Sequence, residues 1–310
     1  MKVLVIHQEI DETRADEADT LIQAKEIEAH LKNLKHETMR LGFEELGKLE
    51  LALHEYKPDV VFNLVESLRG SDKFAYLAPA ILESTKTSFT GNSALPLILA
   101  SDKIKLKFLL SSQNVPTPTG MDTNEGTRFI IKSVSEHASF GIDENSIVTG
   151  FQAAQKVIQE KTRKLGGQWL AEEYIDGREF NLSLLETKNG MLLLPPAEIL
   201  FKDFPKDAPH IIDYRAKWDE TSHAYHHTPR RYCEETSEMK SIAQNTWNAL
   251  ELKGYARIDL RMDSNGKLWV IDINPNPCLS SDAGFMAAAA KYGMSSQEVI
   301  NTILENRTHG

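Results

Sequence analysis

The stretch Gly254–Pro277, GYARIDLRMDSNGKLWVIDINPNP, constrains the fold more than any other part of the chain, because it predicts a β-hairpin. Two runs in which polar and apolar residues alternate, as they do along strands, lie on either side of Asn265-Gly266. An Asn-Gly pair is the strongest short-range signal for a two-residue turn of type I′, since both central residues of that turn need a positive φ. We therefore expect residues 255–262 and 269–273 to pair as antiparallel strands. The apolar face of the second strand would consist of Trp269, Ile271 and Ile273.

The register of this hairpin gathers polar side chains. With the Asn-Gly pair at the apex, Asp259 lies opposite Asp272 and Arg257 lies opposite Asn274, all on one face. Directly opposed carboxylates repel each other, so a cation should offset them. Arg257 contributes, but two carboxylates, an Asn carbonyl and nearby phosphate oxygens are the ligand set that Mg²⁺ prefers. The alternative is a solvated sheet face with scattered charges, followed by an ordinary proline turn.

The composition excludes several classes of function. With 35 Lys and Arg against 45 Asp and Glu, the formal net charge of −10 makes binding to a nucleic-acid backbone unfavourable. No apolar run approaches the roughly 20 residues of a membrane span, and the N-terminus lacks the apolar core of a signal peptide. Two cysteines, Cys233 and Cys278, are too few for a disulfide framework. We expect a cytoplasmic protein with no membrane or nucleic-acid partner.

The first third of the chain predicts an α/β domain. The run KVLVI and residues 59–65 are continuous apolar stretches, as in strands that are buried on both faces. Helices are expected at about 16–34 and 74–82, which indicates a small parallel sheet with helices on its faces. No Gly-x-Gly-x-x-Gly follows the first strand, so a dinucleotide-binding site loses its main support.

Less regular elements follow. We expect a helix with a proline-containing connector (101–120), β-strands (128–132 and 169–175), a long loop that crosses or covers a site (202–231) and a helix (234–252). Ser295 and Glu298 form a capping-box pattern that predicts the start of the last helix.

Five segments, in family order, resemble the ATP-grasp ligases, most nearly the D-alanine–D-alanine ligase group. The segment FTGNSALPLILASDKIKLKFLL resembles the entry into the ATP-binding region, and FIIKSVSEHASFGI resembles the phosphate loop with its Lys. The segment WLAEEYIDGREFN is similar to the strand and turn that hold adenine and ribose, and IIDYRAKW is similar to the start of the lid loop. The fifth segment is the hairpin, which looks like the family's metal-binding hairpin.

The resemblance implies an α/β (α+β) ATP-grasp fold with an N-terminal Rossmann-like, parallel-sheet (pre-ATP-grasp) domain. It places that domain at 1–102, a central subdomain at 103–180 and a C-terminal catalytic and metal-binding subdomain at 181–310. The lid loop would span about 202–231. Relatives in this group are often dimers, so a homodimer is expected.

The resemblance also implies phosphate contacts. Lys103 and Lys132 would contact ATP phosphates as point charges. Otherwise they would be surface lysines, which suits Lys132 poorly because it ends an apolar β-run. The phosphate loop would include Glu136, Ala138 and Ser139, where small residues let backbone N–H groups approach phosphate oxygens.

For the rest of the nucleotide, Glu172 would accept from the adenine amino group. Glu173, Tyr174 and Ile175 would lie along the ring edge, and Glu179 would bind the ribose hydroxyls. The alternative for these residues is a charged strand edge.

The implied catalytic groups lie in the lid and the hairpin. Lys217 would reach the γ-phosphate, and Arg257 would stabilise the oxyanion of a tetrahedral intermediate. Asp259, Asp272 and Asn274 would hold Mg²⁺, or Mn²⁺ in its place. The implied reaction activates a carboxylate as an acyl phosphate with ATP, after which an amine displaces phosphate.

The substrate positions depart from the family's pattern. The segment QEIDETRADEAD lacks the family's Glu-x-x-Val-Ser, and Glu66 lies where the family has a His-Gly pair. Ala138 and Trp218 replace a Ser and a Tyr of the first-substrate network. Cys278 and Ala283 replace the Gly and Ser that bind the carboxylate of the second substrate.

We therefore expect a ligase that joins a carboxylate to an amine, with substrates other than D-alanine. Glu9, Glu12, Glu66 and Asp282 are candidate contacts for an amine or a cationic side chain, and each could equally be a surface acid. The alternatives are a genuine D-alanine–D-alanine ligase, an ATP-grasp phosphotransferase and a non-catalytic ATP-binding regulator.

Overall fold

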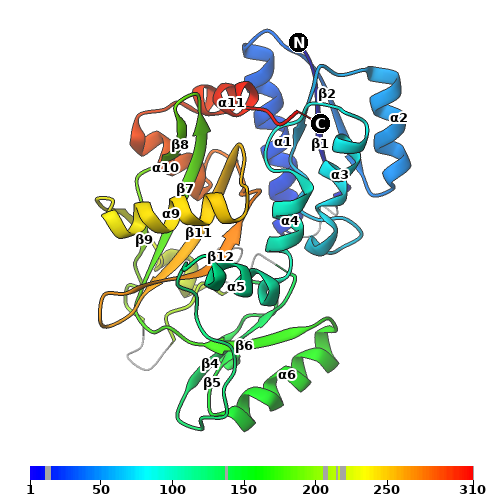
Figure 1. Cartoon of the computed structure of the whole chain (residues 1–310). Helices are drawn as coiled ribbons and strands as arrows, with labels where there is room; N and C mark the ends of the chain where they lie inside the picture. Colours follow the sequence, from blue (N-terminus) through cyan, green and yellow to red (C-terminus); the bar gives the residue numbers. More distant parts are fainter. Residues whose placement is uncertain (11–14, 137–138, 205–208, 214–215, 217–220, 310) are drawn as a thin grey trace.

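The computed structural model describes residues 1–10, 15–136, 139–204, 209–213, 216 and 221–309. These residues form three sheets with helices packed around them (Figure 1). None of the described helices is long and apolar enough to cross a membrane.

The N-terminal sheet is parallel and has the strand order β2-β1-β3, as the apolar runs predicted. Its elements are β1 (Lys2–Gln8), α1 (Ala15–Asn33), β2 (Glu37–Phe43), α2 (Leu46–Tyr56), β3 (Val60–Asn63), the 3-10 helix η1 (Asp72–Phe74) and α3 (Leu77–Ser84). Val3 and Val5 belong to the core cluster on the α1 side, whereas Leu4 and Ile6 belong to the cluster on the side of α2 and α3. Because helices cover both faces of β1, successive residues 3–6 of this strand are all buried, and this run is apolar throughout instead of alternating with polar residues.

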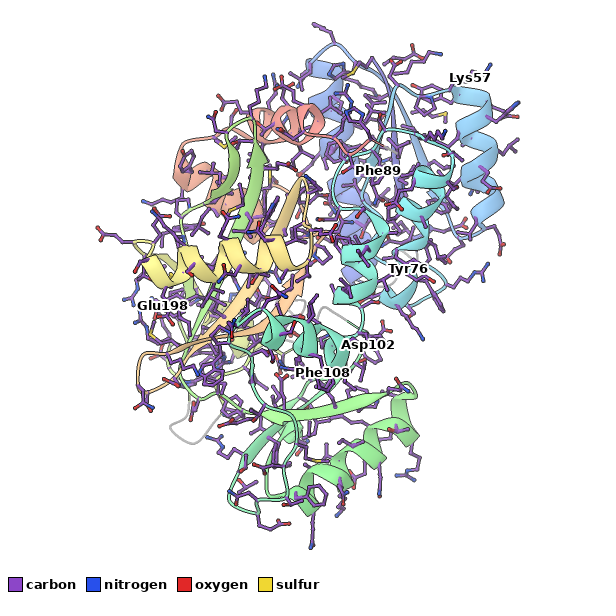
Figure 2. The ribbon with its side chains drawn as sticks, in the orientation of Figure 1. Lys57, Tyr76, Phe89, Asp102, Phe108 and Glu198 are labelled. Carbon is purple, nitrogen blue, oxygen red and sulfur yellow. The ribbon has the colours of Figure 1, made fainter. Side chains whose placement is uncertain are left out.

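The chain returns to this sheet at its end. Helices α10 (Gly284–Tyr292) and α11 (Ser296–Glu305) contribute to the same core as α1, and Thr308 exchanges backbone hydrogen bonds with Phe89 (Figures 1 and 2). The predicted capping box opens α11, with Ser295 and Glu298 bonding each other's backbone. The domain boundaries at 102 and 180 stay a prediction.

The middle of the chain forms a small antiparallel sheet, β5-β4-β6, with one helix packed on it. Its elements are α4 (Ala94–Ala100), α5 (Lys103–Ser112), β4 (Arg128–Ser133), the 3-10 helix η2 (Glu144–Ser146), β5 (Ile147–Thr149), α6 (Phe151–Leu165) and β6 (Trp169–Glu173). Asp102 caps α5, because its carboxylate accepts from the Lys105 N–H at 3.0 Å (Figure 2). This cap makes Lys103 the first residue of the helix.

The third sheet has the order β10-β9-β7-β11-β12, with β8 pairing β7. Its strands are β7 (Arg178–Thr187), β8 (Gly190–Leu193), β9 (Ala197–Ile199), β10 (Arg230–Tyr232), β11 (Tyr255–Met262) and β12 (Leu268–Asn274). Helix α9 (Ser237–Ala249) packs on β7 and β8, and the short α8 (His223–His226) precedes β10. Strand β10 therefore ends the long loop predicted at 202–231 and joins that segment to the sheet.

The hairpin β11–β12 has the predicted register at the site, but two predictions about it are wrong. Asp259 lies opposite Asp272, and Arg257 lies opposite Asn274. The turn is not the predicted two-residue type I′. Gly266 has a positive φ of 83°, Asn265 does not, and the Gly266 N–H donates to the Asp263 carbonyl at 3.0 Å.

A β-bulge cancels the effect of this longer turn. Near the turn the strands pair one residue out of the expected register, with Leu260 opposite Val270, and Ile271 is the extra residue before Asp272. The predicted apolar face is also wrong in part, because the pleat changes phase at Ile271. The buried residues of β12 are Leu268, Val270 and Ile273.

Candidate active site

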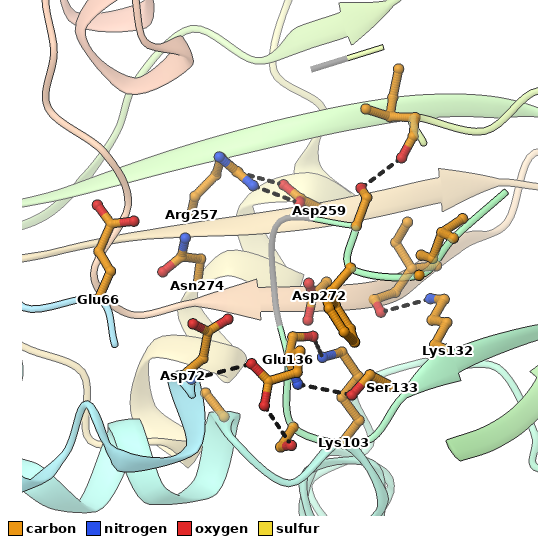
Figure 3. Close-up of a pocket in the computed structure, with 18 of the residues that line it drawn as sticks. Glu66, Asp72, Lys103, Lys132, Ser133, Glu136, Arg257, Asp259, Asp272 and Asn274 are labelled. Atoms are coloured by element: carbon orange, nitrogen blue, oxygen red, sulfur yellow. Dashed lines mark hydrogen bonds and ion pairs between the residues drawn. The ribbon is translucent and has the colours of Figure 1, made fainter. Parts of the chain in front are cut away.

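A pocket of about 1110 Å³ lies among the three sheets. Its walls come from the hairpin β11–β12, from strands β4, β6 and β7, and from the loops after β3 and β12. The close-up in Figure 3 shows Arg257, Asp259, Asp272 and Asn274 from the hairpin on one side. Facing them are Lys132 from β4, Glu136 from the loop after β4 and Lys103 from the start of α5.

Arg257 forms a two-pronged ion pair with Asp259. Its Nε and Nη2 atoms lie 2.8 and 3.0 Å from the two carboxylate oxygens (Figure 3). The Asn181 amide donates to the same Asp259 at 2.8 Å. Burial by itself would lower the pKa of Arg257, but the charges of Asp259 and Asp272 outweigh it and raise the pKa. The guanidinium therefore remains a permanent positive charge beside the carboxylate pair.

The hairpin carries a donor set that suits a hard divalent cation. Asp259 and Asp272 are directly opposed, and the Asn274 amide follows on the same face. Carboxylate and amide oxygens are ligands of Mg²⁺, which takes its remaining ligands from water or phosphate. Within the described residues no group of three or more His, Cys, Asp and Glu side chains is placed to hold a metal, so the set depends on the amide and on a ligand's oxygens.

A buried carboxylate on β6 lies between two lysines. Glu172 is 1% exposed, and its oxygens lie 2.5 Å from Lys132 Nζ and 2.6 Å from Lys107 Nζ. Burial works against the ionised carboxylate, but the charges of Lys132 and Lys107 outweigh it and hold the pKa of Glu172 below its usual range. The same burial lowers the pKa of Lys107. The triad carries one net positive charge at the base of the pocket.

The phosphate-loop residues are held in place by the loops around them. Lys103 is buried, and its Nζ donates to the Glu136 carbonyl at 2.8 Å. The Glu136 carboxylate accepts from Ser71 Oγ at 2.6 Å and from the Asp72 N–H at 3.2 Å, which ties this loop to the start of η1 (Figure 3). Ser139 has a positive φ of 63° and donates from Oγ to the Ile212 carbonyl at 2.7 Å.

The expected adenine and ribose residues line one end of the pocket. Tyr174 and Ile175 are each 7% exposed, and both belong to the pocket wall with Glu173. The Glu179 carboxylate is bound by Arg261 Nη2 at 2.8 Å, and Arg261 is itself buried at 4% exposure. This ion pair fixes Glu179 toward the pocket.

The opposite end holds the expected substrate residues. Glu66, Cys278, Asp282 and Ala283 all line the pocket. Glu9 does not, because its side chain is 63% exposed and lies 4.0 Å from Lys48.

Burial favours the neutral forms of Glu66 and of the Cys278 thiol. Burial, assisted by the charges of Asp72 and Asp19, raises the pKa of Glu66 to about 8. Burial also raises the pKa of the Cys278 thiol, so the thiol stays protonated and suits a packing or hydrogen-bonding role rather than a nucleophilic one.

Comparison with known proteins agrees with this architecture. The family model described as D-ala D-ala ligase C-terminus matches residues 116–305. The chain belongs to the D-alanine–D-alanine ligase family. It is similar to Uncharacterized protein y4sG of Sinorhizobium fredii, with 32% identity over 303 residues that cover 91% of this chain and 86% of the relative. It is also similar to a D-alanine–D-alanine ligase of Carboxydothermus hydrogenoformans, with 28% identity over 279 residues, 80% of this chain and 86% of the relative.

Solved structures of this family share the fold. The crystal structure of D-alanine–D-alanine ligase from Bacillus anthracis matches with a TM-score of 0.76 at 21% identity, over 99% of this chain and 97% of that one. VanG D-Ala:D-Ser ligase from Enterococcus faecalis matches with a TM-score of 0.71 at 16% identity, over 98% of each chain. These matches confirm the predicted α/β ATP-grasp architecture with an N-terminal parallel sheet.

Four of the residues singled out from the sequence lie outside the described part of the chain, and the structure says nothing of them. They are Glu12, Ala138, Lys217 and Trp218. The nucleotide and metal roles of the other family positions stay predictions, although the pocket brings those residues together.

Sequence reasoning assigned no role to several charged or polar groups that line the pocket or contact its lining residues. Asn181 and Arg261 lie on the same sheet face as Asp259. The alternation along the strand places Arg261 on that face but gives it no role, and Asn181 was not considered. Lys107 and Asp19 come from helices α5 and α1, where they resemble surface charges. Only the tertiary packing shows that Lys107 reaches Glu172 and that Asp19 lines the pocket.

Proposed function

We propose that this member of the family is an ATP-dependent ligase that joins a carboxylate to an amine through an acyl phosphate, with ADP and phosphate as the other products. The observation that carries the proposal is the hairpin register, which sets Asp259 opposite Asp272 and Arg257 beside Asn274. Lys103 and Lys132 face this group across the pocket (Figure 3). A relative of the same fold, D-alanine–D-alanine ligase from Bacillus anthracis, is described as complexed with ATP, which supports ATP as the nucleotide.

The first step is phosphoryl transfer. A carboxylate oxygen of the substrate attacks the γ-phosphorus of ATP, and the bond to the bridging oxygen breaks with its electrons on ADP. Lys103 and Lys132 supply positive charge to the phosphate oxygens from buried positions, where charge stabilisation is stronger than in water. Asp259, Asp272 and Asn274 would hold Mg²⁺, which neutralises phosphate charge when bound.

The second step is acyl transfer. The amine lone pair attacks the acyl carbon, the C–N bond forms, phosphate leaves with the electrons of the C–O bond, and the nitrogen loses one proton to water. Arg257 lies beside the carboxylate pair and points along the hairpin face, where its guanidinium would stabilise the oxyanion of the tetrahedral intermediate (Figure 3). Its raised pKa keeps it charged throughout.

We further propose that the substrates differ from two molecules of D-alanine. Glu66, Cys278 and Ala283 lie in the substrate end of the pocket, and each replaces a residue type that the D-alanine ligases use there. We also propose that the protein acts in the cytoplasm. We expect it to be a homodimer, and sedimentation of the purified protein tests this oligomeric state.

A hydroxylamine trap tests the proposed reaction. Incubation with ATP, Mg²⁺, hydroxylamine and a panel of carboxylates, D- and L-amino acids included, should give hydroxamate and free phosphate with the correct carboxylate. A stable phosphorylated product without hydroxamate would favour a phosphotransferase. Binding of ATP without turnover of any carboxylate would favour a regulator, and efficient formation of D-alanyl-D-alanine would refute the changed substrates.

A further inference from the structure

A buried arginine of the hairpin lies at the end of the pocket where the adenine and ribose residues are expected, which we call the nucleotide end. Arg261 belongs to β11, is buried and lines the pocket. It follows Asp259 by two residues and therefore lies on the same sheet face. A buried guanidinium needs an opposite charge and acceptors for its N–H groups, because removal of a charge from water is otherwise costly. The partners of Arg261 therefore show which parts of the pocket it holds.

The first partner is a carboxylate of the neighbouring strand. Arg261 lies directly opposite Glu179 in the antiparallel pair of β7 and β11. Its Nη2 atom donates to Glu179 Oε2 at 2.8 Å, and both side chains are buried. A charge-assisted hydrogen bond of this kind fixes the direction of the carboxylate as well as its charge. The pair therefore holds Glu179 as an oriented, ionised acceptor in the wall of the pocket.

The other donors of Arg261 reach backbone carbonyls of two further segments. Nη1 donates to the Gly177 carbonyl at 3.3 Å and lies 3.5 Å from the Ile175 carbonyl oxygen, both in the connection between β6 and β7. Nη2 also donates to the carbonyl of His210, which accepts from the Tyr174 hydroxyl at 3.3 Å as well. One planar guanidinium thus joins strand β7, the β6–β7 connection and the segment that contains His210.

The wall at the nucleotide end combines apolar side chains with this ion pair. Ile130, Tyr174 and Ile211 pack in one cluster, and all three line the pocket. The Arg261 guanidinium lies 5.5 Å from the centre of the Tyr174 ring. Apolar walls suit a flat heteroaromatic base, and an oriented carboxylate can accept from hydroxyl groups of a sugar. The combination fits the base and the ribose of a nucleotide.

From these contacts we infer that Arg261 is a positioning residue for the nucleotide, and that it sets the preference for ribose over deoxyribose through Glu179. The inference rests on the proposed ligase function, which assigns this end of the pocket to ATP. Arg261 acts through other residues. It orients the Glu179 carboxylate and holds the β6–β7 connection and the His210 carbonyl in place. A lysine cannot do the same, because its ammonium group is a point charge without a planar fork of donors.

Titration calorimetry with ADP and 2′-deoxy-ADP, each in the presence of Mg²⁺, tests this inference. ADP is a product of the proposed reaction, so no second substrate is needed. For the wild type we expect ADP to bind at least about tenfold more tightly than 2′-deoxy-ADP, as for the loss of one hydrogen bond to an oriented carboxylate. Arg261→Lys should weaken ADP binding about tenfold and reduce the preference to about threefold or less.

A matched substitution on the same pair of strands is the control. Arg178 belongs to β7 and binds the buried Glu198 carboxylate at 2.7 and 3.0 Å, and neither residue belongs to the pocket wall. Arg178→Lys should leave both affinities and their ratio at the wild-type values. This control separates a role in nucleotide binding from the general effect of replacing an arginine that pairs with a buried glutamate.

A double variant separates binding from stability. Arg261→Met alone leaves the Glu179 carboxylate buried without its arginine and should lower the urea concentration at the midpoint of unfolding. Adding Glu179→Gln removes that carboxylate and should restore part of the stability. The double variant should nevertheless bind ADP and 2′-deoxy-ADP with affinities within about threefold of each other.

The outcomes distinguish this inference from the proposed function. If neither nucleotide binds to the wild type, the proposed ATP-dependent function fails. If ADP binds but the wild type shows no preference for it, or if Arg261→Lys keeps the wild-type affinities or weakens both nucleotides by the same factor, the role of Arg261 is refuted while the ligase proposal stands. Retention of the ADP preference in the double variant, or its loss in Arg178→Lys, would refute that role as well.

Discussion

Replacement of Glu66 by Gln should make the protein more stable at neutral and alkaline pH. The folded chain raises the pKa of Glu66 from 4.5 to about 8, chiefly through burial. Folding holds this carboxyl in its neutral form, so Glu66 does not reduce the stability of the folded chain well below pH 4.5. The loss of stability grows as the pH rises, because the carboxyl ionises in the unfolded chain first. The loss stops growing above about pH 8, where the folded protein ionises too.

The size of the effect follows from the two pKa values. At pH 7 the unfolded chain is favoured by about 3 kcal/mol through this group, against about 1 kcal/mol at pH 5. Gln keeps an oxygen that accepts from Gln23 and cannot ionise. The free energy of unfolding of the variant, relative to that of the wild type, should therefore increase by about 2 kcal/mol from pH 5 to pH 7. For a protein of this size that is about 4 °C in Tm.

Thermal unfolding of the two proteins without ligand, in matched buffers from pH 5 to pH 8, measures this difference. The Glu9→Gln protein is the control, because its carboxylate is exposed beside Lys48, and its Tm offset from wild type should not vary with pH. Parallel pH profiles for Glu66→Gln and wild type would refute the reasoning, since they would mean that a cation already compensates Glu66 in the folded chain.

Three further substitutions test other parts of the structure. Asp259→Asn should keep the fold but reduce Mg²⁺-dependent ATP turnover by about a hundredfold or more, and full turnover would show that the hairpin is not the metal site. Lys107→Met leaves Glu172 with one lysine and should cost about 2 kcal/mol in urea unfolding, partly recovered by adding Glu172→Gln. Gly177→Ala places a Cβ 2.0 Å from a backbone carbonyl oxygen of the hairpin, at a φ of 149°, and should lower the free energy of unfolding by about 3 kcal/mol or more. Gly47→Ala is the matched control, because its Cβ would meet no atom within 4 Å, and it should be neutral or stabilising. Equal melting temperatures for the two alanine variants would contradict the close approach at Gly177.

Local patterns predicted the elements whose residues carry the information themselves. Continuous apolar runs gave β1 and β3, because both faces of each strand are buried. Spacing alone gave the capping box at Ser295 and Glu298. The hairpin register was correct at Asp259 and Asp272 only because two deviations cancel, one in the turn and one at the bulge. Neither deviation has a local signal, since a bulge depends on how the strands fit their neighbours.

The substrate end shows where sequence reasoning had to stop. Asp19 lies near the start of the chain and Cys278 and Asp282 near its end, and they meet because α10 and α11 pack against α1 and the N-terminal sheet. From local sequence alone, an Asp on a helix and an Asp in a loop are each predicted to be solvent-exposed charges. They share an environment only in the folded protein, where the C-terminal helices pack against α1 and the N-terminal sheet. The residues expected at the nucleotide and the metal, by contrast, lie within residues 103–274, in motifs that each fit on one strand, one turn or the start of one helix. The positions that resemble the family can therefore be predicted from short segments, whereas the residues expected to select a substrate come together only because α10 and α11 pack against α1.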